Sequence, residues 1–268
     1  MRIAHLSDIH FGGENPSAVA GAAAWLAAFP PDLTILTGDL TAFGHEPEFA
    51  KARAWAQTLT GPILALPGNH DTPYLGLLER LIRPFARFER SFGLADGARW
   101  ANEEAIVASV NTARGAQLRW NWSKGAIAMA QVEAALANLG ASVTPAARII
   151  ACHHPLTEMV GGPMTGRVRG GRKAARRFCE EGVDLVLTGH IHAPFVWPFA
   201  HGDGHTYAVG AGTLSLRERG APPSFSLIAI EPGAIEVTAL AWTGARFENW
   251  RNWSLERRPH SLGRQRSS

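Results

Sequence analysis

Cysteine and charge are both scarce in this sequence. Its 268 residues include two cysteines, Cys152 and Cys179, too few for a disulfide framework or a cysteine-based metal ribbon, and we expect both to be reduced, buried thiols. Charged residues make up 18% and apolar residues 46% of the chain, a balance that excludes disorder because the apolar material suffices for a large core. The 28 glycines and 17 prolines are too few for a fibrous protein. We therefore expect a globular protein.

Long apolar runs and a strong excess of one charge are also lacking. The most apolar helical run, 18–29, is much shorter than the roughly 20 residues of a membrane span. The first residues lack the apolar core and cleavage site of a signal peptide. We therefore expect a cytoplasmic protein with no membrane partner. The net charge is only +3, so nucleic acid, which requires a broad basic surface, is not an expected partner.

Short apolar runs alternate with helical patterns through the first two thirds of the chain. Compact runs typical of buried strands cover 2–6, 33–37, 63–66, 105–110, 148–152 and 184–188. Helical patterns, several with Pro near the start or Gly after the end, cover 17–29, 46–59, 73–88, 128–139 and 171–181. Strands expected at 207–209, 224–230 and 235–242 are separated only by turns, which predicts a closing antiparallel meander.

This order of elements predicts the fold class and the domain organisation. Sheets of this kind pack face to face with helices outside, so we expect an α/β protein with a four-layer αββα sandwich of two packed mixed sheets. One domain covers 1–256, and a small cap insertion over 93–124 is left open. The polar, basic segment 257–268 has no apolar periodicity and is expected to be a flexible tail.

Side chains that can bind metals stand directly after five of the expected strands. They are found in Ser7-Asp8-Ile9-His10, Gly38-Asp39, Gly68-Asn69-His70-Asp71, His153-His154-Pro155 and Gly189-His190-Ile191-His192. The carboxyl ends of neighbouring strands meet at one edge of a sheet, where ligands bind. Residues two apart in extended backbone share a face, so Asp-x-His and His-x-His pairs can act as two-armed metal clamps. We expect these five segments to build one site.

The donor types narrow the choice of metal. Imidazole mixed with carboxylate suits Mn, Fe, Zn, Co or Ni, whereas Ca takes an all-oxygen shell and Cu(I) prefers sulfur. The number of donors favours two divalent metal ions over one. The glycines before Asp39, Asn69 and His190 allow sharp turns and a close backbone approach to an ion.

The five blocks, present in this order from residue 8 to residue 192, resemble the motif set of the calcineurin-like metallophosphoesterase superfamily. Within this superfamily, three of the motifs are most similar to those of the bacterial class III cyclic-nucleotide phosphodiesterases and related glycerophosphodiesterases. They are Leu-Ser-Asp-Ile-His-Phe at 6–11, the Gly-Asn-His-Asp block and His-His-Pro. The resemblance implies the sandwich fold, with the closing meander in its second sheet. It also implies a metal-dependent phosphoric ester hydrolase, and relatives of this type are often homodimers or larger homo-oligomers.

The resemblance further implies two ligand sets and a catalytic histidine. The first metal would be held by Asp8, His10, Asp39 and His192. The second would be held by Asp39, Asn69, His153 and His190. Asp39 would bridge the ions, and a hydroxide shared by them would attack phosphorus in line. His70 would face the substrate, stabilise the transition state and protonate the leaving oxygen. Asp71 either orients His70 or caps a helix that begins at Pro73.

Several functions share this chemistry. We expect hydrolysis of a small phosphodiester, such as a cyclic nucleotide or a glycerophosphodiester, and leave open a phosphomonoesterase or pyrophosphatase of the same superfamily. A DNA-repair exonuclease would share the blocks but need a broad basic surface. A non-catalytic, metal-braced binding module predicts a missing motif, and none of the blocks is missing.

The remaining candidates have competing interpretations. His5 and His154 are expected to make structural hydrogen bonds. His45, His201 and His205 are expected in loops, although the resemblance leaves a substrate-facing role open for His201. The arginine-rich segment 167–177 fits a solvated helix face with Arg–Glu pairs better than a phosphate-steering rim. Trp120 and Trp122, in the loop 115–125, either stack on a substrate over the cleft or pack in the core.

Overall fold

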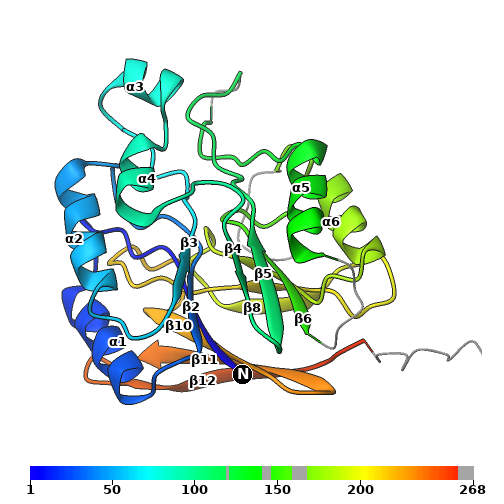
Figure 1. Cartoon of the computed structure of the whole chain (residues 1–268). Helices are drawn as coiled ribbons and strands as arrows, with labels where there is room; N and C mark the ends of the chain where they lie inside the picture. Colours follow the sequence, from blue (N-terminus) through cyan, green and yellow to red (C-terminus); the bar gives the residue numbers. More distant parts are fainter. Residues whose placement is uncertain (119–120, 141–145, 159–167, 259–268) are drawn as a thin grey trace, which may run out of the picture.

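Two sheets pack face to face in the computed structural model, with helices on both outer sides (Figure 1). The structure describes residues 1–118, 121–140, 146–158 and 168–258. Figure 1 shows α1 (Pro16–Ala28) and α2 (Glu46–Ala56) on one side of the sheets, and α5 (Met129–Leu139) and α6 (Gly171–Glu180) on the other. This arrangement confirms the expected four-layer αββα sandwich.

The first sheet has the strand order β12-β11-β10-β1-β2-β3. Its strands are β1 (Arg2–Leu6), β2 (Leu33–Leu36), β3 (Ile63–Ala65), β10 (Ser224–Ile230), β11 (Ala234–Trp242) and β12 (Phe247–Glu256). The strands β1, β2 and β3 run parallel, whereas β10 pairs antiparallel with β1. The sheet is therefore mixed, as expected.

The second sheet has the order β4-β5-β6-β7-β9-β8. Its strands are β4 (Arg99–Ala101), β5 (Ala105–Ser109), β6 (Ala147–Ala151), β7 (Leu185–Thr188), β8 (Phe195–Pro198) and β9 (Tyr207–Gly210). The strands β5, β6, β7 and β9 run parallel, and β4 and β8 close the two edges in antiparallel pairing.

The closing meander differs from the prediction. The expected strand at 207–209 is β9, which pairs parallel with β7 in the second sheet. Only β10, β11 and β12 form a meander, and it extends the first sheet through the β1–β10 pair rather than completing the second. The chain therefore crosses from one sheet to the other between β9 and β10, a long-range pairing that the local pattern of alternating residues does not encode.

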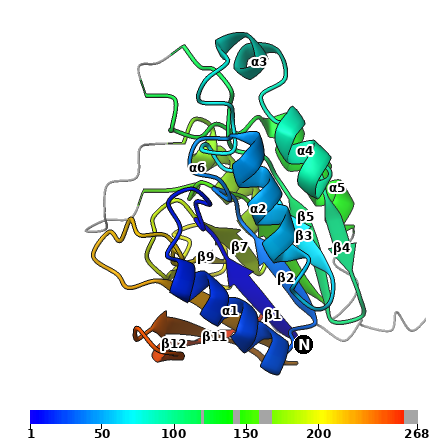
Figure 2. The same ribbon diagram turned by 90° about the vertical axis from the view of Figure 1, so that its left-hand side faces the viewer.

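Three apolar clusters hold the layers together. In β1, Ala4 and Leu6 belong to the cluster under α1 and α2, while Ile3 belongs to the cluster between the two sheets. A third cluster joins the second sheet to α5 and α6. Figure 2 shows α1 and α2 lying across the first sheet. Because each fully buried Leu or Ile side chain stabilises the fold by about 1.5–3 kcal/mol, this packing fixes the strand ends that carry the candidate site.

The single helix expected at 73–88 is wrong, because two short helices replace it. Helix α3 (Leu77–Ile82) follows Gly76, which has a left-handed φ of 107°, and α4 (Ala86–Phe92) follows Pro84. A residue before proline avoids the helical region, so Arg83 ends α3. None of the α3 residues is buried, and Figure 1 shows this helix projecting from the rest of the protein.

The structure describes part of the possible cap at 93–124 and the start of the expected tail at 257–268. The range 93–124 contains β4 and β5, so residues 99–109 belong to the second sheet rather than to a cap. In the expected tail, Arg257 is buried, and its Nη1 donates to the carbonyl of Glu231 at 2.9 Å; 259–268 lie outside the described residues. Among the helices described, none has the length and apolar character needed to cross a membrane.

Candidate metal centre and active site

The residues singled out in the sequence stand on the loops after β1, β2, β3, β6 and β7, and the structure brings them together. We call seven of them the ligand cluster: Asp8, His10, Asp39, Asn69, His153, His190 and His192. Candidate ligand atoms of Asp8, His10 and His192 lie within 4.8 Å of one another, as do those of Asp8, Asp39 and His153. Donors from both sheets therefore meet at the carboxyl edge, as the strand order requires.

The first half of the ligand cluster is formed by Asp8, His10 and His192. The distance from His192 Nε2 to Asp8 Oδ1 is 3.1 Å, and His10 Nε2 lies 3.3 Å from His192 Nε2 and 3.8 Å from Asp8 Oδ1. All three residues are buried. Their ligand atoms therefore converge on one small volume.

The second half is centred on Asp39. Its Oδ2 lies 3.3 Å from His153 Nε2 and 3.8 Å from His10 Nε2, so this carboxylate stands between the two halves. The rings of His153 and His190 meet edge to face with centroids 5.2 Å apart. Asn69 is buried, and it lines a cavity beside the cluster. Asp39 therefore lies between candidate ligand atoms contributed by both sheets.

Backbone strain is concentrated in the ligand cluster. Among the described residues, the non-glycine residues with positive φ are Asp8 (53°), His10 (53°), Asp39 (51°), His190 (70°) and His192 (67°). The left-handed region costs an L-residue about 1–2 kcal/mol, and such strain persists where surrounding structure enforces it, often at functional sites. All five residues are predicted ligands, so the strain coincides with the expected chemistry.

Two glycines allow the loops of the cluster to touch. A Cβ at Gly68 would collide with the backbone and carboxylate of Asp39. A Cβ at Gly189 would collide with Ser7 Oγ and lie 2.6 Å from Asp8 Oδ2. The backbone N–H of His190 can therefore donate to Asp8 Oδ2 at 2.8 Å. Close backbone contact, rather than bulk packing, thus holds these carboxylates in place.

Backbone carbonyls orient the histidine rings. The Nδ1 atoms of His153, His192 and His70 lie 2.7, 2.8 and 2.6 Å from the carbonyl oxygens of Thr37, Arg217 and Ala42, respectively. Because a carbonyl oxygen only accepts hydrogen bonds, each Nδ1 carries the hydrogen, and the Nε2 of a neutral ring presents a lone pair. In His153 and His192 that lone pair faces a carboxylate oxygen.

The pKa values in the ligand cluster reflect the close packing of its carboxylates and imidazoles. Burial alone would raise the pKa of Asp8 and Asp39, but neighbouring histidines outweigh it, and both pKa values lie below the usual range. Burial lowers the pKa of His153, yet the charge of Asp39 more than offsets this and raises it to about 9. Burial lowers the pKa of His190 to about 3. The cluster therefore holds two carboxylates that demand positive charge.

The donors present fit a divalent metal. Asp8 Oδ1, Asn69 Oδ1 and His153 Nε2 are buried and, within the described part of the chain, make no hydrogen bond. Leaving such buried polar atoms without a hydrogen bond is costly in free energy. A neutral imidazole nitrogen whose lone pair faces a carboxylate oxygen is stable only with a cation or an added proton between the two atoms. Mixed imidazole, carboxylate and amide oxygen donors suit borderline divalent metals. The sequence-derived expectation of clustered metal donors is confirmed.

Asp71 joins two loops of the site through its carboxylate. Its carboxylate accepts hydrogen bonds from the backbone N–H groups of Leu40, Thr41 and Gly68, at 3.2, 2.9 and 2.9 Å. The cap interpretation is wrong, because no helix begins at Pro73 in the described structure. The His70 ring is oriented by the Ala42 carbonyl instead. Asp71 thus ties together the loops after β2 and β3, which carry Asp39 and Asn69.

The structural hydrogen bonds expected of His5 and His154 are confirmed. His5 Nε2 lies 3.0 Å from Thr37 Oγ1. His154 Nδ1 lies 2.9 Å from Thr112 Oγ1, and its Nε2 lies 2.8 Å from the carbonyl of Ser123. Both ring nitrogens of His154 are therefore engaged outside the ligand cluster, although His154 adjoins His153 and His190.

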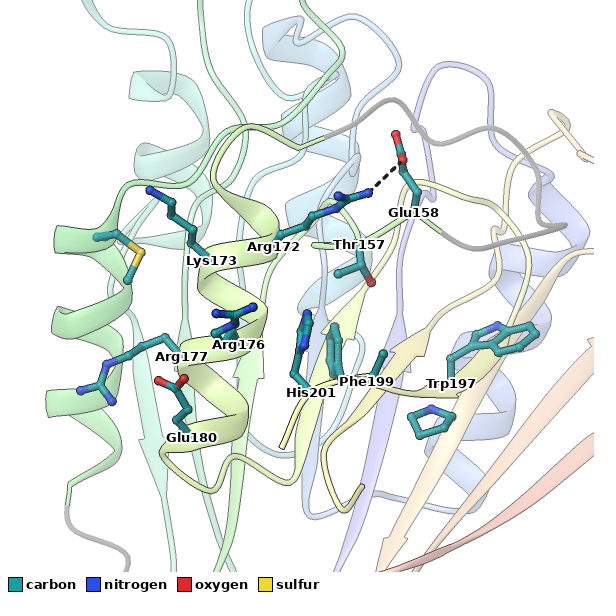
Figure 3. A pocket seen from close by; sticks show the side chains of 13 residues that line it. Thr157, Glu158, Arg172, Lys173, Arg176, Arg177, Glu180, Trp197, Phe199 and His201 are labelled. Atoms are coloured by element: carbon teal, nitrogen blue, oxygen red, sulfur yellow. Dashed lines mark ion pairs between the residues drawn. The ribbon is translucent and has the colours of Figure 1, made fainter. Parts of the chain in front are cut away.

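The arginine-rich helix lines a separate groove of about 860 Å³ (Figure 3). Arg177 pairs with Glu181 one helical turn away and with Glu133 of α5, which confirms the Arg–Glu pairs expected on this face. Figure 3 shows His201 on this groove beside α6. None of the groove's described lining residues belongs to the ligand cluster. Residues 167 and 159–166 lie outside the described chain.

A second cavity, of about 490 Å³, adjoins the ligand cluster, and we call it the aromatic cavity. It is lined by Ala42, Phe43, Asn69, His70, Thr72, Tyr74, Arg80, Asn121, Trp122 and Ser123. Trp122 thus lies over the cleft, one of the two positions left open for it, while Trp120 lies outside the described residues. Sequence reasoning missed Phe43, Tyr74 and Arg80. Their only signal was proximity to the Asp39 and Asn69 blocks.

Comparison with known proteins agrees with this fold and site. A family profile described as calcineurin-like phosphoesterase matches residues 1–194. The chain belongs to the calcineurin-like phosphoesterase family, as the resemblance of its five motif blocks indicated. It is also 25% identical, over 263 residues, to a protein of Synechococcus sp. named as a probable cyclic nucleotide phosphodiesterase; the match covers 90% of this chain and 92% of the relative.

Solved structures share the fold at low sequence identity. The purple acid phosphatase from yellow lupin (Lupinus luteus) seeds superposes with a TM-score of 0.69 at 13% identity, covering 96% of this chain and 54% of that one. The chain therefore spans about half the length of that phosphatase. GAP50, the anchor in the inner membrane complex of Plasmodium, gives 0.63 at 12% identity, with 97% and 89% covered. Since the fold occurs in a phosphatase and in an anchor, function must be argued from the site.

Proposed function

We propose that this protein hydrolyses phosphodiester bonds of small substrates with two divalent metal ions. The observation that carries the proposal is the convergence of buried acceptor atoms, in which His192 Nε2 and Asp8 Oδ1 stand 3.1 Å apart and His153 Nε2 and Asp39 Oδ2 stand 3.3 Å apart. Such an arrangement calls for cations in its centre. Membership of the calcineurin-like phosphoesterase family gives the reaction class.

The ligand cluster divides naturally into two sets. Asp8, His10, Asp39 and His192 would hold one ion, and Asp39, Asn69, His153 and His190 the other, with Mn, Fe, Zn or Co as candidates. When bound, a pair of divalent metals supplies an activated water and neutralises charge on the phosphoryl oxygens. The protein's own part is to fix the donors, which the carbonyl contacts of Thr37 and Arg217 achieve by orienting His153 and His192.

His70 is positioned to move a proton. Its backbone N–H donates to Asp39 Oδ1 at 2.8 Å, and its ring meets the His10 ring edge to face with centroids 4.8 Å apart. Because Nδ1 donates to the Ala42 carbonyl, Nε2 is the atom available for acid–base chemistry. His70 also lines the aromatic cavity, so a leaving alcohol bound there would lie beside this ring and take its proton.

Two observations support a preference for a diester: the cavity beside the ligand cluster and the name of a related protein. A diester carries a second alcohol group, and the aromatic cavity offers about 490 Å³ next to Asn69 and His70. The Synechococcus relative is named as a probable cyclic nucleotide phosphodiesterase. We therefore place the substrate among small phosphodiesters such as cyclic nucleotides or glycerophosphodiesters.

The test is a hydrolysis panel on protein reconstituted separately with Mn, Fe, Zn and Co after chelation. The substrates are cyclic nucleotides, glycerophosphodiesters, phosphomonoesters, pyrophosphates and single-stranded DNA. We expect a small diester to give the highest kcat/KM, and chelation to abolish hydrolysis. A preference for a monoester, pyrophosphate or DNA would overturn the diester assignment, and full activity after exhaustive chelation would overturn the metal-dependent mechanism.

A further inference from the structure

The aromatic cavity is lined by the rings of Phe43, Tyr74 and Trp122, together with Asn69 and His70. Phe43 and Tyr74 contact each other, with ring centroids 5.7 Å apart and planes at 70°. Trp122 contributes a third ring to the lining. Tyr74 is exposed, so its ring is free to contact a bound molecule. A cavity with this lining favours a flat, unsaturated guest over a flexible polyol.

Trp122 is held by a contact to its ring and by a hydrogen bond of the next residue in the chain. The Arg80 guanidinium lies over the Trp122 ring, 5.2 Å from its centroid, and Arg80 Nε donates to the carbonyl of Gly115 at 2.7 Å. The Ser123 carbonyl contacts buried His154 Nε2 at 2.8 Å. A cation on one face of an indole polarises the ring and holds it in place. Trp122 is therefore held beside the cavity before any substrate binds.

Polar groups complement these rings. Asn121 and Ser123 also line the cavity. The Asn121 carboxamide oxygen accepts from the Ser123 N–H at 2.9 Å, so its amide group retains donors for a guest. Partial burial lowers the pKa of Arg80, but guanidinium remains charged at neutral pH and favours an anionic ligand nearby. Flat rings, amide donors and a cation beside a phosphate site together match a nucleotide.

We propose that the aromatic cavity binds the nucleobase of a nucleotide diester, with Trp122 as its stacking platform and Tyr74 as a second ring contact. This inference rests on the proposed function and deepens it, because it selects cyclic nucleotides over glycerophosphodiesters. A base held there places its sugar-phosphate at Asn69 and His70, whereas a glycerol head group has no flat face to stack on these rings. Trp122 is thereby a specificity-determining residue rather than a catalytic one.

Kinetics of the metal-reconstituted Trp122→Leu variant test this assignment with two substrates, cyclic AMP and glycerophosphoglycerol, whose head group carries neither a flat ring nor a cation for an aromatic lining. We expect kcat/KM for cyclic AMP to fall by roughly tenfold or more, chiefly through KM, while kcat/KM for glycerophosphoglycerol changes less than about twofold. Trp197→Leu is the matched control, because Trp197 lines the other groove, and it should leave both substrates unchanged. Equal losses on both substrates, or none on cyclic AMP, would overturn the proposal.

A second measurement separates this proposal from the proposed function. Adenosine has no phosphate for the ligand cluster, and saturation-transfer NMR reports its binding with metal or with chelator. We expect binding in both states and its loss in Trp122→Leu. Hydrolysis without adenosine binding would overturn the cavity assignment alone. Binding that depends on Trp122 in a protein that hydrolyses neither diester would overturn only the proposed function.

A further variant covers the case in which Trp122→Leu fails to fold. Tyr74 is 63% exposed, so Tyr74→Ala should keep the wild-type melting temperature. It removes the second ring and should weaken adenosine binding and raise KM for cyclic AMP by about fivefold or more. Unchanged adenosine binding and unchanged KM in folded Tyr74→Ala would contradict the contact proposed for Tyr74.

Discussion

The ligand cluster and the rim of the aromatic cavity are built in opposite ways. The cluster draws buried side chains from loops after five strands, and several of them are held in a strained backbone. The rim is formed by α3 and by the loop that carries Trp122, and side chains such as Leu78 and Tyr74 are largely exposed there. The candidate metal donors are therefore fixed by the sheets, while the proposed substrate contacts lie on short surface elements.

This contrast matches what each region has to do. Metal donors must be placed to within a fraction of an ångström, so they stand where packing fixes the backbone. Substrate selection needs only a surface of suitable shape and charge, so it can change without disturbing the donors. The two regions meet at His70, which contacts Asp39 through its backbone and faces the cavity with its ring.

The largest expected effect comes from removing the shared carboxylate. Asp39→Ala should lose bound metal and lower kcat/KM by on the order of a thousandfold or more, because this residue stands between both ligand sets. Metal analysis and diester hydrolysis measure the two losses. Asp203→Ala is a matched control, since Asp203 pairs with Arg258 away from the cluster. Full metal occupancy with a normal rate in Asp39→Ala would show that Asp39 is not the bridge.

His70→Ala tests the junction between the two regions. The variant should keep its metal and lose about a hundredfold or more in kcat on glycerophosphocholine, whose alkoxide leaving group needs a proton. Loss on bis(p-nitrophenyl) phosphate should be far smaller, because nitrophenolate leaves without one. His205→Ala is the control, because the half-buried His205 ring contacts the Glu256 carbonyl, and it should behave like wild type. Equal losses on the two substrates would rule out proton donation by His70.

Gly189→Ala probes how tightly the cluster is packed. The new methyl group would collide with Ser7 and crowd the Asp8 carboxylate, and overpacking of this kind costs about 1–3 kcal/mol. Urea unfolding should show that loss, together with weaker metal binding. Gly233→Ala is the matched control, because no atom lies within 4 Å of its added Cβ. If both variants unfold at the same urea concentration, the loops are looser than the structure indicates.

A comparison of Asp8→Gly with Asp8→Ala isolates backbone strain. Both lose the same carboxylate, but glycine accepts the φ of 53° at this position at little cost, whereas alanine does not. In the presence of chelator, the free energy of unfolding should be higher for Asp8→Gly by about 1 kcal/mol. Equal stability, or a more stable Asp8→Ala, would mean that the left-handed conformation is not enforced in solution.

The smallest effect is expected at the rim. Leu78 is 71% exposed on α3, so Leu78→Ser should change the free energy of unfolding by less than about 0.5 kcal/mol. Metal content should also stay at the wild-type level. A large loss of either would show that α3 supports the cluster, and the contrast between the two regions would fail.

The strands that carry the site could be predicted because each is a short apolar run ended by polar residues. This local pattern predicts that Asp8, Asp39 and His153 each follow the carboxyl end of a strand, which is where the structure has them, although His153 belongs to the second sheet. The edge strands β4, β8 and β12 were not predicted, since edge strands are partly exposed and mix polar with apolar residues. The strand β9 (Tyr207–Gly210) belongs to the second sheet because it pairs in parallel with β7 (Leu185–Thr188). The apolar pattern of β9 alone does not indicate this partner.

The rim was predicted less well for a similar reason. The pair Arg83-Pro84 was a signal that the helix expected at 73–88 would break, but the position of Arg80 over Trp122 depends on how two distant segments meet. Neither the left-handed backbone at Asp8 nor the carbonyl contact of His153 has a local sequence signature. Spacing predicted which residues form the site, whereas tertiary contacts decide how they are held.

The spread of the ligand cluster along the chain also constrains when the protein can acquire its cofactor. Asp8 and Asp39 leave the ribosome early, whereas His192 follows more than half of the chain later, and β10 must still be made before it can pair with β1. A nascent chain thus carries an incomplete chelator through most of its synthesis. The complete set of donors exists only after most of the chain has been made, so the proposed metal ions can be bound by the full cluster only late in biogenesis.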